Sequence, residues 1–329
     1  MDYIASSDRY KNMKYKRCGK SGLKLPAISL GLWHNFGSVD DFDNATKMAT
    51  TAFDTGITHF DLANNYGPIP GSAESNFGKI LKQQFKHYRD ELIISSKAGY
   101  TMWEGPYGDW GSRKYLISSC DQSLKRLNLD YVDIFYHHRY DPETPLEESM
   151  NALASIVQAG KALYVGISNY PVHAAIEAFK ILKELKTPAV LHQVRYNMLN
   201  RMHEEEGTFK LLDEYGVGGI VFSPLAQGLL SDRYLTGIPN DSRMTRNHFL
   251  KEEVLTDELL NQINKLNIFA KKRDMSLVNL AIKWLLARQG VTSTLIGASS
   301  PEQIKNIVEG LNKPKLTPED MISLDKILS

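Results

Sequence analysis

Four reactive side chains lie at or just beyond the ends of three short apolar runs in the first half of the sequence. They are Asp61, Tyr66, Lys97 and His138. A tyrosine hydroxyl titrates near pH ~10, but a nearby ammonium lowers the pKa of that hydroxyl, and a carboxylate keeps the ammonium charged. An Asp, a Lys and a Tyr can therefore deliver a proton to a carbonyl oxygen, while a histidine orients and polarises that oxygen.

Each of these residues, taken alone, also has an ordinary structural explanation. Asp61 can cap the turn that follows it, Lys97 can extend its charged end to solvent, and His138 can be a hydrogen-bonded core residue. Their occurrence together, at the ends of consecutive apolar runs, favours catalysis. A lyase that uses Lys97 as a Schiff-base nucleophile is an alternative, but a neighbouring carboxylate should keep that lysine protonated and poorly nucleophilic.

Eight short runs rich in β-branched and apolar residues alternate with longer amphipathic stretches. This alternation is typical of βα units on a parallel sheet. Eight units of roughly 30 to 40 residues favour a closed (β/α)8 TIM barrel, with 1–329 as a single domain, over an open doubly wound sheet. The predicted strands cover residues 27–33, 57–63, 91–98, 132–139, 162–170, 189–196, 218–225 and 293–300.

The amphipathic stretches between these strands are predicted to be helices, and several begin with Ser, Asp or Pro. Gly56, Gly160 and Gly216 precede strands at positions where a helix C-cap needs a positive φ. Before the first strand, residues 15–25 are predicted to form a small hairpin that plugs one end of the barrel. The predicted helices cover 43–54, 72–85, 114–127, 146–158, 172–184 and 208–215, with two more that begin at Glu258 and Ser276.

Two long insertions follow predicted strands three and seven. Active sites of such barrels lie at the carboxyl ends of the strands, so both insertions should lie beside the four reactive residues. The first, 99–113, is rich in Gly and aromatic residues and is interpreted as a substrate-gating loop or a packed surface flap. The second, 226–257, contains Arg233, Arg243 and Arg246 and is interpreted as a clamp over an anionic ligand or a solvated loop.

Composition excludes several classes of protein. The chain has 329 residues, with 39 Lys and Arg against 38 Asp and Glu, so its formal net charge is +1. This balance provides no basic field to attract nucleic acid or an anionic membrane. Two cysteines and a polar start without a signal-peptide core indicate a cytoplasmic protein. No apolar run approaches the ~18 residues that a membrane span needs.

Common cofactor motifs are absent from the sequence. The run 19–21, Gly-Lys-Ser, lacks the earlier glycine of a phosphate loop, because Lys14 stands at that position. The run 216–219 precedes a strand instead of following one and lacks the third glycine of the dinucleotide fingerprint. The nine histidines are not at metal-ligand spacing, apart from the adjacent His137 and His138. We therefore expect no metal, and a nucleotide must be held by other groups.

The sequence resembles the aldo-keto reductases over nearly its whole length, roughly 15–311. Within the family it is similar to the branch of L-glyceraldehyde 3-phosphate reductases, which is close to the potassium-channel β subunits; the supporting runs are 64–68, 160–166 and 226–230. The family resemblance is carried by Leu-Gly-Leu-Trp at 30–33, Gly-Ile-Thr-His-Phe-Asp at 56–61, Tyr-Gly at 66–67, Lys97, Asp-Ile-Phe at 133–135, His-Arg at 138–139, Gly-Ile-Ser-Asn at 166–169 and Ser-Pro-Leu at 223–225.

The resemblance implies an NADP(H)-dependent reductase of small aldehydes such as L-glyceraldehyde 3-phosphate or methylglyoxal, in which Asp61, Tyr66, Lys97 and His138 form the catalytic tetrad and Tyr66 is the general acid. It implies that Ser168, Asn169 and Gln193 bind the nicotinamide carboxamide and that Phe222 stacks on the ring. The other implied coenzyme residues are Trp33, Ser223, Leu225, Gln227, Arg233, Arg243, Ser299, Gln303 and Asn306.

Substrate binding is assigned to four residues, of which Trp33 and Tyr66 come from the resemblance. Arg139 and Arg113 are candidate phosphate partners, because a guanidinium fork matches phosphate oxygens; surface salt bridges are the alternative for both. We expect a small-molecule substrate and a homo-oligomer, as in relatives of this branch.

The sequence departs from the family pattern at the adenosine 2′-phosphate. Many members place a Lys and an Arg there, whereas this chain has Gly297 and Gln303. Arg243 is expected to substitute for them, so the choice between NADPH and NADH is left open. The alternative function is a non-catalytic NADP(H)-sensing subunit of a larger complex. His138 argues against it, since the channel-associated relatives have Asn at that position.

Overall fold

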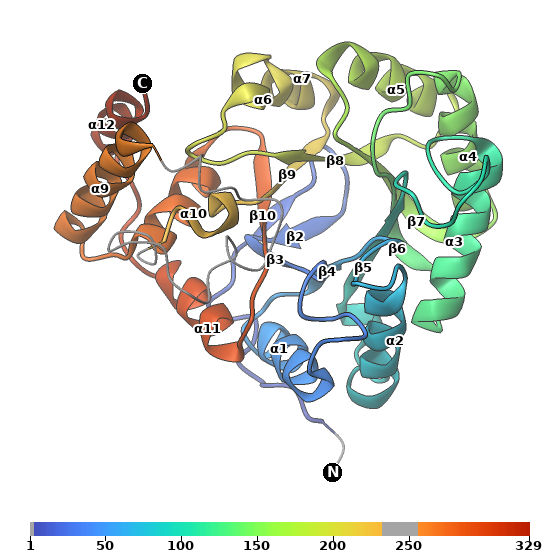
Figure 1. Cartoon of the computed structure of the whole chain (residues 1–329), viewed down its shortest axis with the longest axis horizontal. Coiled ribbons are helices and arrows are strands. Elements are labelled where there is room, and N and C mark those ends of the chain that lie inside the picture. Colours follow the sequence, from blue (N-terminus) through green and yellow to red (C-terminus); the bar gives the residue numbers. More distant parts are fainter. Residues whose placement is uncertain (1–2, 232–255) are drawn as a thin grey trace.

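The computed structural model describes residues 3–231 and 256–329, and within them eight parallel strands close into a barrel. Each strand pairs with its neighbour in sequence, and the last strand pairs with the first (Figure 1). The predicted (β/α)8 fold is therefore confirmed, and one strand, β10, begins two residues earlier than predicted. The barrel strands are β3 Ile28–Gly31, β4 His59–Asp61, β5 Ile93–Ala98, β6 Val132–His137, β7 Ala162–Ser168, β8 Ala189–Arg195, β9 Gly218–Phe222 and β10 Val291–Ile296.

Helices surround the strands and bury their apolar faces against the outside of the barrel (Figure 1). Side-chain oxygens of Ser112, Ser276 and Ser300 accept hydrogen bonds from backbone amides at helix starts. Gly56, Gly160 and Gly216 have positive φ, as predicted. The helices are α1 Phe42–Asp54, α2 Ser72–Gln84, α3 Arg113–Leu127, α4 Leu146–Gln158, α5 Val172–Glu184, α6 Met202–Glu205, α7 Thr208–Tyr215, α9 Asp257–Lys272, α10 Leu277–Ala287, α11 Pro301–Gly310 and α12 Pro318–Leu328, with 3-10 turns η1 Arg89–Glu91 and η2 Ala226–Gly228.

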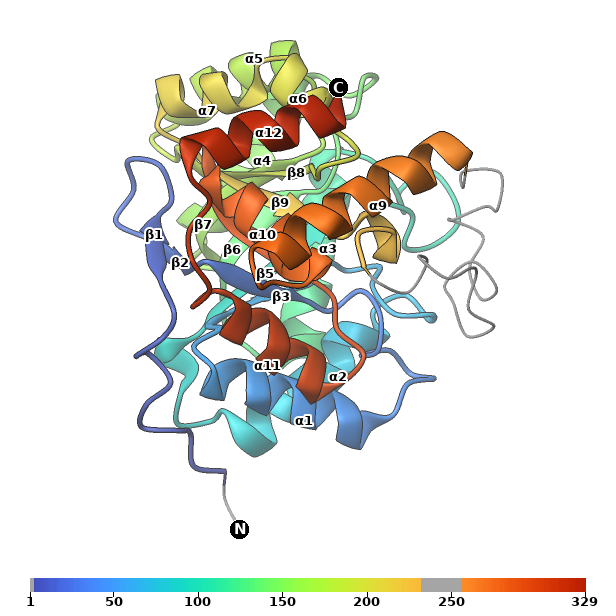
Figure 2. The same ribbon diagram turned by 90° about the vertical axis from the view of Figure 1, so that its left-hand side faces the viewer.

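A hairpin of β1 Tyr15–Arg17 and β2 Lys24–Pro26 covers one end of the barrel (Figure 2). Its Cys18 and Leu25 are buried among side chains of the barrel interior. The backbone of Gly19 lies so close to the Gly216 carbonyl that a Cβ would be 2.0 Å from that oxygen. Lys20 donates its backbone N–H to the same carbonyl at 2.8 Å. The barrel is thus closed at the amino ends of its strands.

Helices α9 and α12 pack against each other at the edge of the molecule (Figures 1 and 2). Arg273 in the turn after α9 forms an ion pair with the buried Asp320 of α12. Among the described residues, no helix has the length and apolar composition that a membrane span requires. The assignment of 1–329 to a single domain stays a prediction.

A small residue in β7 makes room for a large aromatic side chain from β6. The Tyr136 ring from β6 lies across Gly166, where an added Cβ would be 2.4 Å from a ring carbon. Both residues are buried, so neither the ring nor the backbone can move into solvent.

We predict that Gly166→Ala lowers the free energy of unfolding by about 1–3 kcal/mol, because overpacking forces the ring or the strand to shift. Denaturant titration measures this change. Gly22→Ala is the control, because a Cβ there contacts nothing within 4 Å. A Gly166→Ala protein as stable as the control would contradict this account of the barrel interior.

Candidate active site

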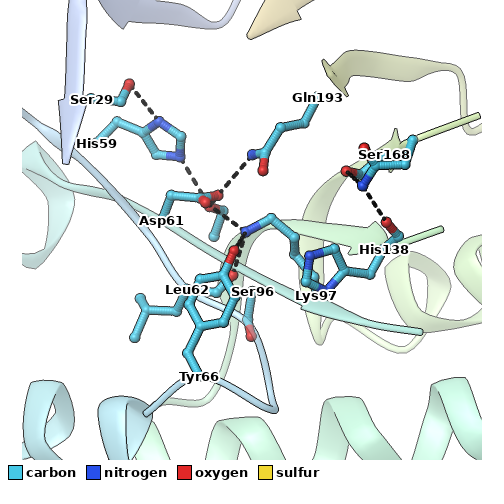
Figure 3. Close-up of polar contacts among 12 residues, drawn as sticks. Ser29, His59, Asp61, Leu62, Tyr66, Ser96, Lys97, His138, Ser168 and Gln193 are labelled. Carbon is cyan, nitrogen blue, oxygen red and sulfur yellow. Dashed lines mark hydrogen bonds and ion pairs between the residues drawn. The ribbon is translucent and has the colours of Figure 1, made fainter. Parts of the chain in front are cut away.

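The four reactive residues meet at the carboxyl ends of neighbouring strands (Figure 3). Asp61 is the last residue of β4, Lys97 is the second-last residue of β5, and His138 follows β6 directly. Tyr66 lies in the turn after β4 and points back toward the strand ends. Parallel strands in a barrel end at the same rim. Residues far apart in the sequence are thus brought into one group.

An ion pair forms the centre of this group. Lys97 Nζ lies 2.5 Å from Asp61 Oδ2, and both side chains are fully buried. The same ammonium donates to the Leu62 carbonyl at 2.6 Å and to the Tyr66 hydroxyl at 3.4 Å. With three hydrogen bonds made, the protonated amine has no lone pair for Schiff-base chemistry. The contact to Tyr66 instead suits stabilisation of a phenolate.

Asp61 has two further partners on its other oxygen. Ser95 donates its hydroxyl to Asp61 Oδ1 at 2.6 Å, and Gln193 donates its side-chain amide to the same atom at 3.2 Å. The sequence interpretation assigned Gln193 to the coenzyme and missed Ser95. The available signal was spacing: Ser95 lies two residues before Lys97, and alternate residues of a strand point to the same face.

Burial controls the protonation states of the site. It raises the pKa of Tyr66 well above its ordinary value, and the negative charge of Asp61 adds to this effect. The pKa of Tyr66 is thus raised and not lowered as expected: the Lys97 ammonium, 3.4 Å from the hydroxyl, favours the phenolate but does not outweigh these effects. Burial also lowers the pKa of Lys97, against the opposing charge of Asp61. Tyr66 is consequently a neutral hydroxyl that holds a proton to donate.

His138 is a neutral imidazole beside Tyr66. Burial, followed by the charge of Lys97, lowers the pKa of His138 well below its ordinary value. Its ring centre lies 5.9 Å from that of Tyr66 and 4.6 Å from that of Tyr100. Its Nδ1 atom is buried and has no hydrogen-bond partner among the described residues. The imidazole is thus held between two aromatic rings at the rim.

Three predicted coenzyme residues lie together next to the tetrad. Ser168 ends β7 and pairs with Gln193 of β8. Asn169 follows with a φ of 53° and donates its side-chain amide to Ser168 Oγ at 3.1 Å and to the His138 carbonyl at 3.2 Å. A hydroxyl and two primary amides, one beside the other, form a donor and acceptor set that matches a carboxamide.

The chain after β9 turns sharply at the same rim. Phe222 ends the strand, and Leu225 precedes the turn η2. Ser223 and Gln227 have positive φ, at 56° and 61°, which is uncommon for residues with a Cβ. Arg233, Arg243 and Arg246 lie in 232–255, outside the described residues.

The strand-eight turn, where the adenosine end is predicted, leads from β10 into α11. Gln303 Oε1 accepts hydrogen bonds from the backbone N–H and the hydroxyl of Ser299, at 2.9 and 3.2 Å. Asn306 is exposed on α11. Both α11 residues therefore lie on the exposed side of that helix, Gln303 in its first turn and Asn306 near its middle.

Trp33 and the two predicted phosphate partners differ in their positions. Trp33 is 44% exposed, and its ring centre lies 6.3 Å from that of Tyr66. Arg113 contacts α4 instead of the tetrad: it donates to the Asn151 carbonyl at 3.3 Å and to Ser155 Oγ at 2.9 Å. Arg113 is the first residue of α3, and its side chain extends from there to the neighbouring helix α4.

Arg139 holds the aromatic loop 99–113 against the tetrad. Its guanidinium donates to the Gly99 carbonyl at 2.7 Å and pairs with Asp109 at 2.6 Å. It also lies over the rings of Tyr100 and Trp110, 4.4 and 3.6 Å from their centres. The residue expected to bind phosphate therefore already has an anionic partner.

Comparison with known proteins identifies the class that this barrel and tetrad define. The model of the aldo/keto reductase family matches residues 27–329, and the chain belongs to this family. It is accordingly an oxidoreductase that acts on aldehydes. The chain is 53% identical over 330 residues to L-glyceraldehyde 3-phosphate reductase of Escherichia coli O157:H7, and equally to the protein of that name from strain K12. Each alignment covers 99% of this chain and 95% of the relative.

Three further histidines around the barrel are buried and neutral. Burial lowers the pKa of His59 and of His137 from 6.5 to about 4, and that of His192 to about 3. In the unfolded chain these imidazoles bind a proton below their ordinary pKa, whereas in the folded chain they do not. These buried imidazoles therefore do not reduce the free energy of unfolding above about pH 6.5, and they reduce it progressively as the pH falls toward 4.

We predict that the free energy of unfolding decreases between pH 7 and pH 5, by about 1–2 kcal/mol for each of these histidines. His192→Gln should reduce that decrease, because one protonation site is removed. His87→Gln is the control, since His87 is exposed. Denaturant titrations at both pH values measure the difference, and an equal pH effect in the two variants would contradict the assignment.

Proposed function

We propose that this protein reduces L-glyceraldehyde 3-phosphate, or a small dicarbonyl aldehyde such as methylglyoxal, with NADPH. The observation that carries the proposal is the contact of Lys97 with both Asp61 and Tyr66 in a buried site. The names of the two relatives support the choice of substrate.

Each of the four residues of the tetrad has its own role in carbonyl reduction. A nicotinamide coenzyme, when bound, would provide the hydride that carbonyl reduction requires. Tyr66 donates its hydroxyl proton to the carbonyl oxygen, so that an alcohol is formed and no charge is left on that oxygen. Lys97 stabilises the resulting phenolate, and Asp61 keeps Lys97 protonated and in place. His138 orients the carbonyl oxygen.

The residues at the rim fit a nicotinamide coenzyme, and members of this family use NAD(P)H. We assign the carboxamide to Ser168, Asn169 and Gln193, whose hydroxyl and amides lie together beside the tetrad, and ring stacking to Phe222. The phosphates and adenosine are assigned to Ser223, Leu225, Gln227, Arg233, Ser299, Gln303 and Asn306, with Arg243 as the partner of the 2′-phosphate that would select NADPH.

We assign the substrate to the space bordered by Trp33, Tyr66 and the loop 99–113. Arg139 acts on the substrate through this loop and not by binding its phosphate, because Asp109 already neutralises the guanidinium. Tyr100, which Arg139 holds by stacking, lies against His138. Arg113 is left out of this site, since it contacts α4.

We predict that Arg139→Ala lowers kcat/KM for L-glyceraldehyde 3-phosphate and for methylglyoxal by similar factors, about tenfold each, because the loop loses its ion pair and its stacking contacts. Lys114→Ala is the control, since the Lys114 ammonium lies over the exposed Tyr107 of the same loop, at 5.4 Å from the ring centre. Steady-state kinetics with both aldehydes measure the effect. A loss confined to the phosphorylated aldehyde would assign Arg139 to the phosphate instead.

The proposed function is tested by coenzyme oxidation across a panel of short aldehydes with NADPH and with NADH. We predict turnover with NADPH and the two named aldehydes, and a loss of kcat of about a thousandfold in Tyr66→Phe, which lacks the proton donor. The Kd for NADPH should not change in this variant. Tight NADPH binding with no turnover of any aldehyde would favour the non-catalytic coenzyme-sensing subunit.

We further propose a cytoplasmic homo-oligomer, on the resemblance to the branch described above. Sedimentation of the purified protein measures the oligomeric state, and a monomer at all concentrations would overturn that part of the proposal.

A further inference from the structure

A row of buried polar groups lies beneath Asp61, inside a barrel whose interior is otherwise largely apolar. Ser95 Oγ is 2.6 Å from Asp61 Oδ1, and His59 Nε2 is 3.0 Å from Ser95 Oγ. On its other side, His59 Nδ1 is 2.8 Å from Ser29 Oγ, which is 2.7 Å from Ser293 Oγ. All of these side chains are fully buried. Figure 3 shows the part of the row from Ser29 to Asp61.

Strand register brings these residues together. They come from β10, β3, β4 and β5, which are consecutive around the closed barrel. Asp61 of β4 pairs with Ser95 of β5, and His59 lies two residues before Asp61 on the same face of β4. Ser293 lies two residues before Leu295, the partner of Ser29. The row therefore crosses the junction at which the last strand meets the first.

The hydrogen bonds of this row can run in one direction only. Asp61, paired with the Lys97 ammonium, is a carboxylate and accepts, so the Ser95 hydroxyl must donate to it. Ser95 Oγ then accepts from the N–H at His59 Nε2. A neutral imidazole has one N–H, so Nδ1 accepts from Ser29, whose oxygen accepts from Ser293.

His59 is neutral because of its surroundings. Burial lowers the pKa of His59 to about 4, and the charge of Lys97 lowers it further, against the opposing charge of Asp61. The serines on both sides of the ring carry no charge. The direction of the row is thus set at its end by the carboxylate and is kept by the single proton of the imidazole.

We propose that Ser95, His59, Ser29 and Ser293 are positioning residues for aldehyde reduction: they hold Asp61 Oδ1 so that Oδ2 faces Lys97. This inference rests on the proposed roles of Asp61, Lys97 and Tyr66. Ser95, together with Gln193, replaces the water that would surround this carboxylate oxygen at the surface. The donors behind Ser95 strengthen its hydrogen bond, because hydrogen bonds in a chain strengthen one another. All four side chains are fully buried beneath Asp61, so we expect them to affect the rate of proton transfer and not substrate binding.

Adjacent serines in β5 provide a matched experiment. Ser95 and Ser96 are both fully buried, and each donates its hydroxyl to a buried carboxylate. Ser95 donates to Asp61 inside the barrel, whereas Ser96 donates to Glu74 of α2 outside it, at 2.5 Å. Ser95→Ala and Ser96→Ala therefore remove the same type of interaction from neighbouring positions.

We predict that both variants lower the thermal midpoint of unfolding and that Ser95→Ala alone lowers kcat, by about tenfold, the effect of one hydrogen bond to a charged group. KM and the Kd for NADPH should not change in either variant. A Ser95→Ala protein with the kcat of the wild type, or equal decreases of kcat in both variants, would overturn the proposal.

A second measurement does not depend on activity. Long-range 15N–1H correlation spectra of the histidine rings in the full-length protein should show His59 as a neutral imidazole with its proton on Nε2. Its signals are identified as those that move in Ser29→Ala and in Ser95→Ala. A proton on Nδ1 or an imidazolium would overturn the directed row, even if the protein reduces aldehydes. Conversely, failure of the aldehyde panel would leave this spectroscopic result in place and would refute only the proposed function.

Discussion

The buried ion pair between Lys97 and Asp61 is the interaction on which the site depends. Each of the two charges loses several kcal/mol of hydration free energy when it is removed from water. Their mutual attraction offsets this loss only when their remaining hydrogen-bond positions are also filled. Here they are filled: the ammonium reaches Leu62 and Tyr66, and the carboxylate receives Ser95 and Gln193. Removing either charge would leave the other alone in the barrel, at a cost of about 3–5 kcal/mol. The pair therefore fixes the positions of the strand ends around it, in addition to its role in the chemistry.

The barrel supplies this arrangement through its register. Asp61 lies opposite Ser95, and Lys97 lies opposite Tyr136, so β4, β5 and β6 deliver their polar groups to one level of the rim. Inside the barrel, Gly166 and Tyr136 fit against each other, and the hairpin closes the far end. Solvent is thereby kept away from the proton-transfer group on all sides except the rim.

Much of this organisation could be predicted from the sequence. Apolar runs between caps and glycines located all eight strands, and the positions of Asp61, Lys97 and His138 at strand ends followed from parallel topology. The start of β10 was missed because Val291 and Thr292 follow directly on the turn at Gly290. The direction in which the Tyr66 pKa shifts could not be predicted, since it depends on how deeply the ring is buried and on how close the charges of Asp61 and Lys97 lie to it. The partners of Arg139 and Arg113 depend on loop packing, which leaves no periodic pattern in a sequence.

The hairpin that closes the barrel has a consequence for how the chain folds. Its residues contact Gly216 and, through Lys16, the carbonyl of Val291, and β3 pairs with β10 across more than two thirds of the sequence. Contacts between such distant segments are slow to form, because the chain loses the conformational entropy of a long loop before these contacts stabilise it. During synthesis the first segments made must wait for nearly the last before the sheet can close. Until then β3, which pairs with β4 on one side, has an exposed edge on the other side, and such an edge can pair with another chain.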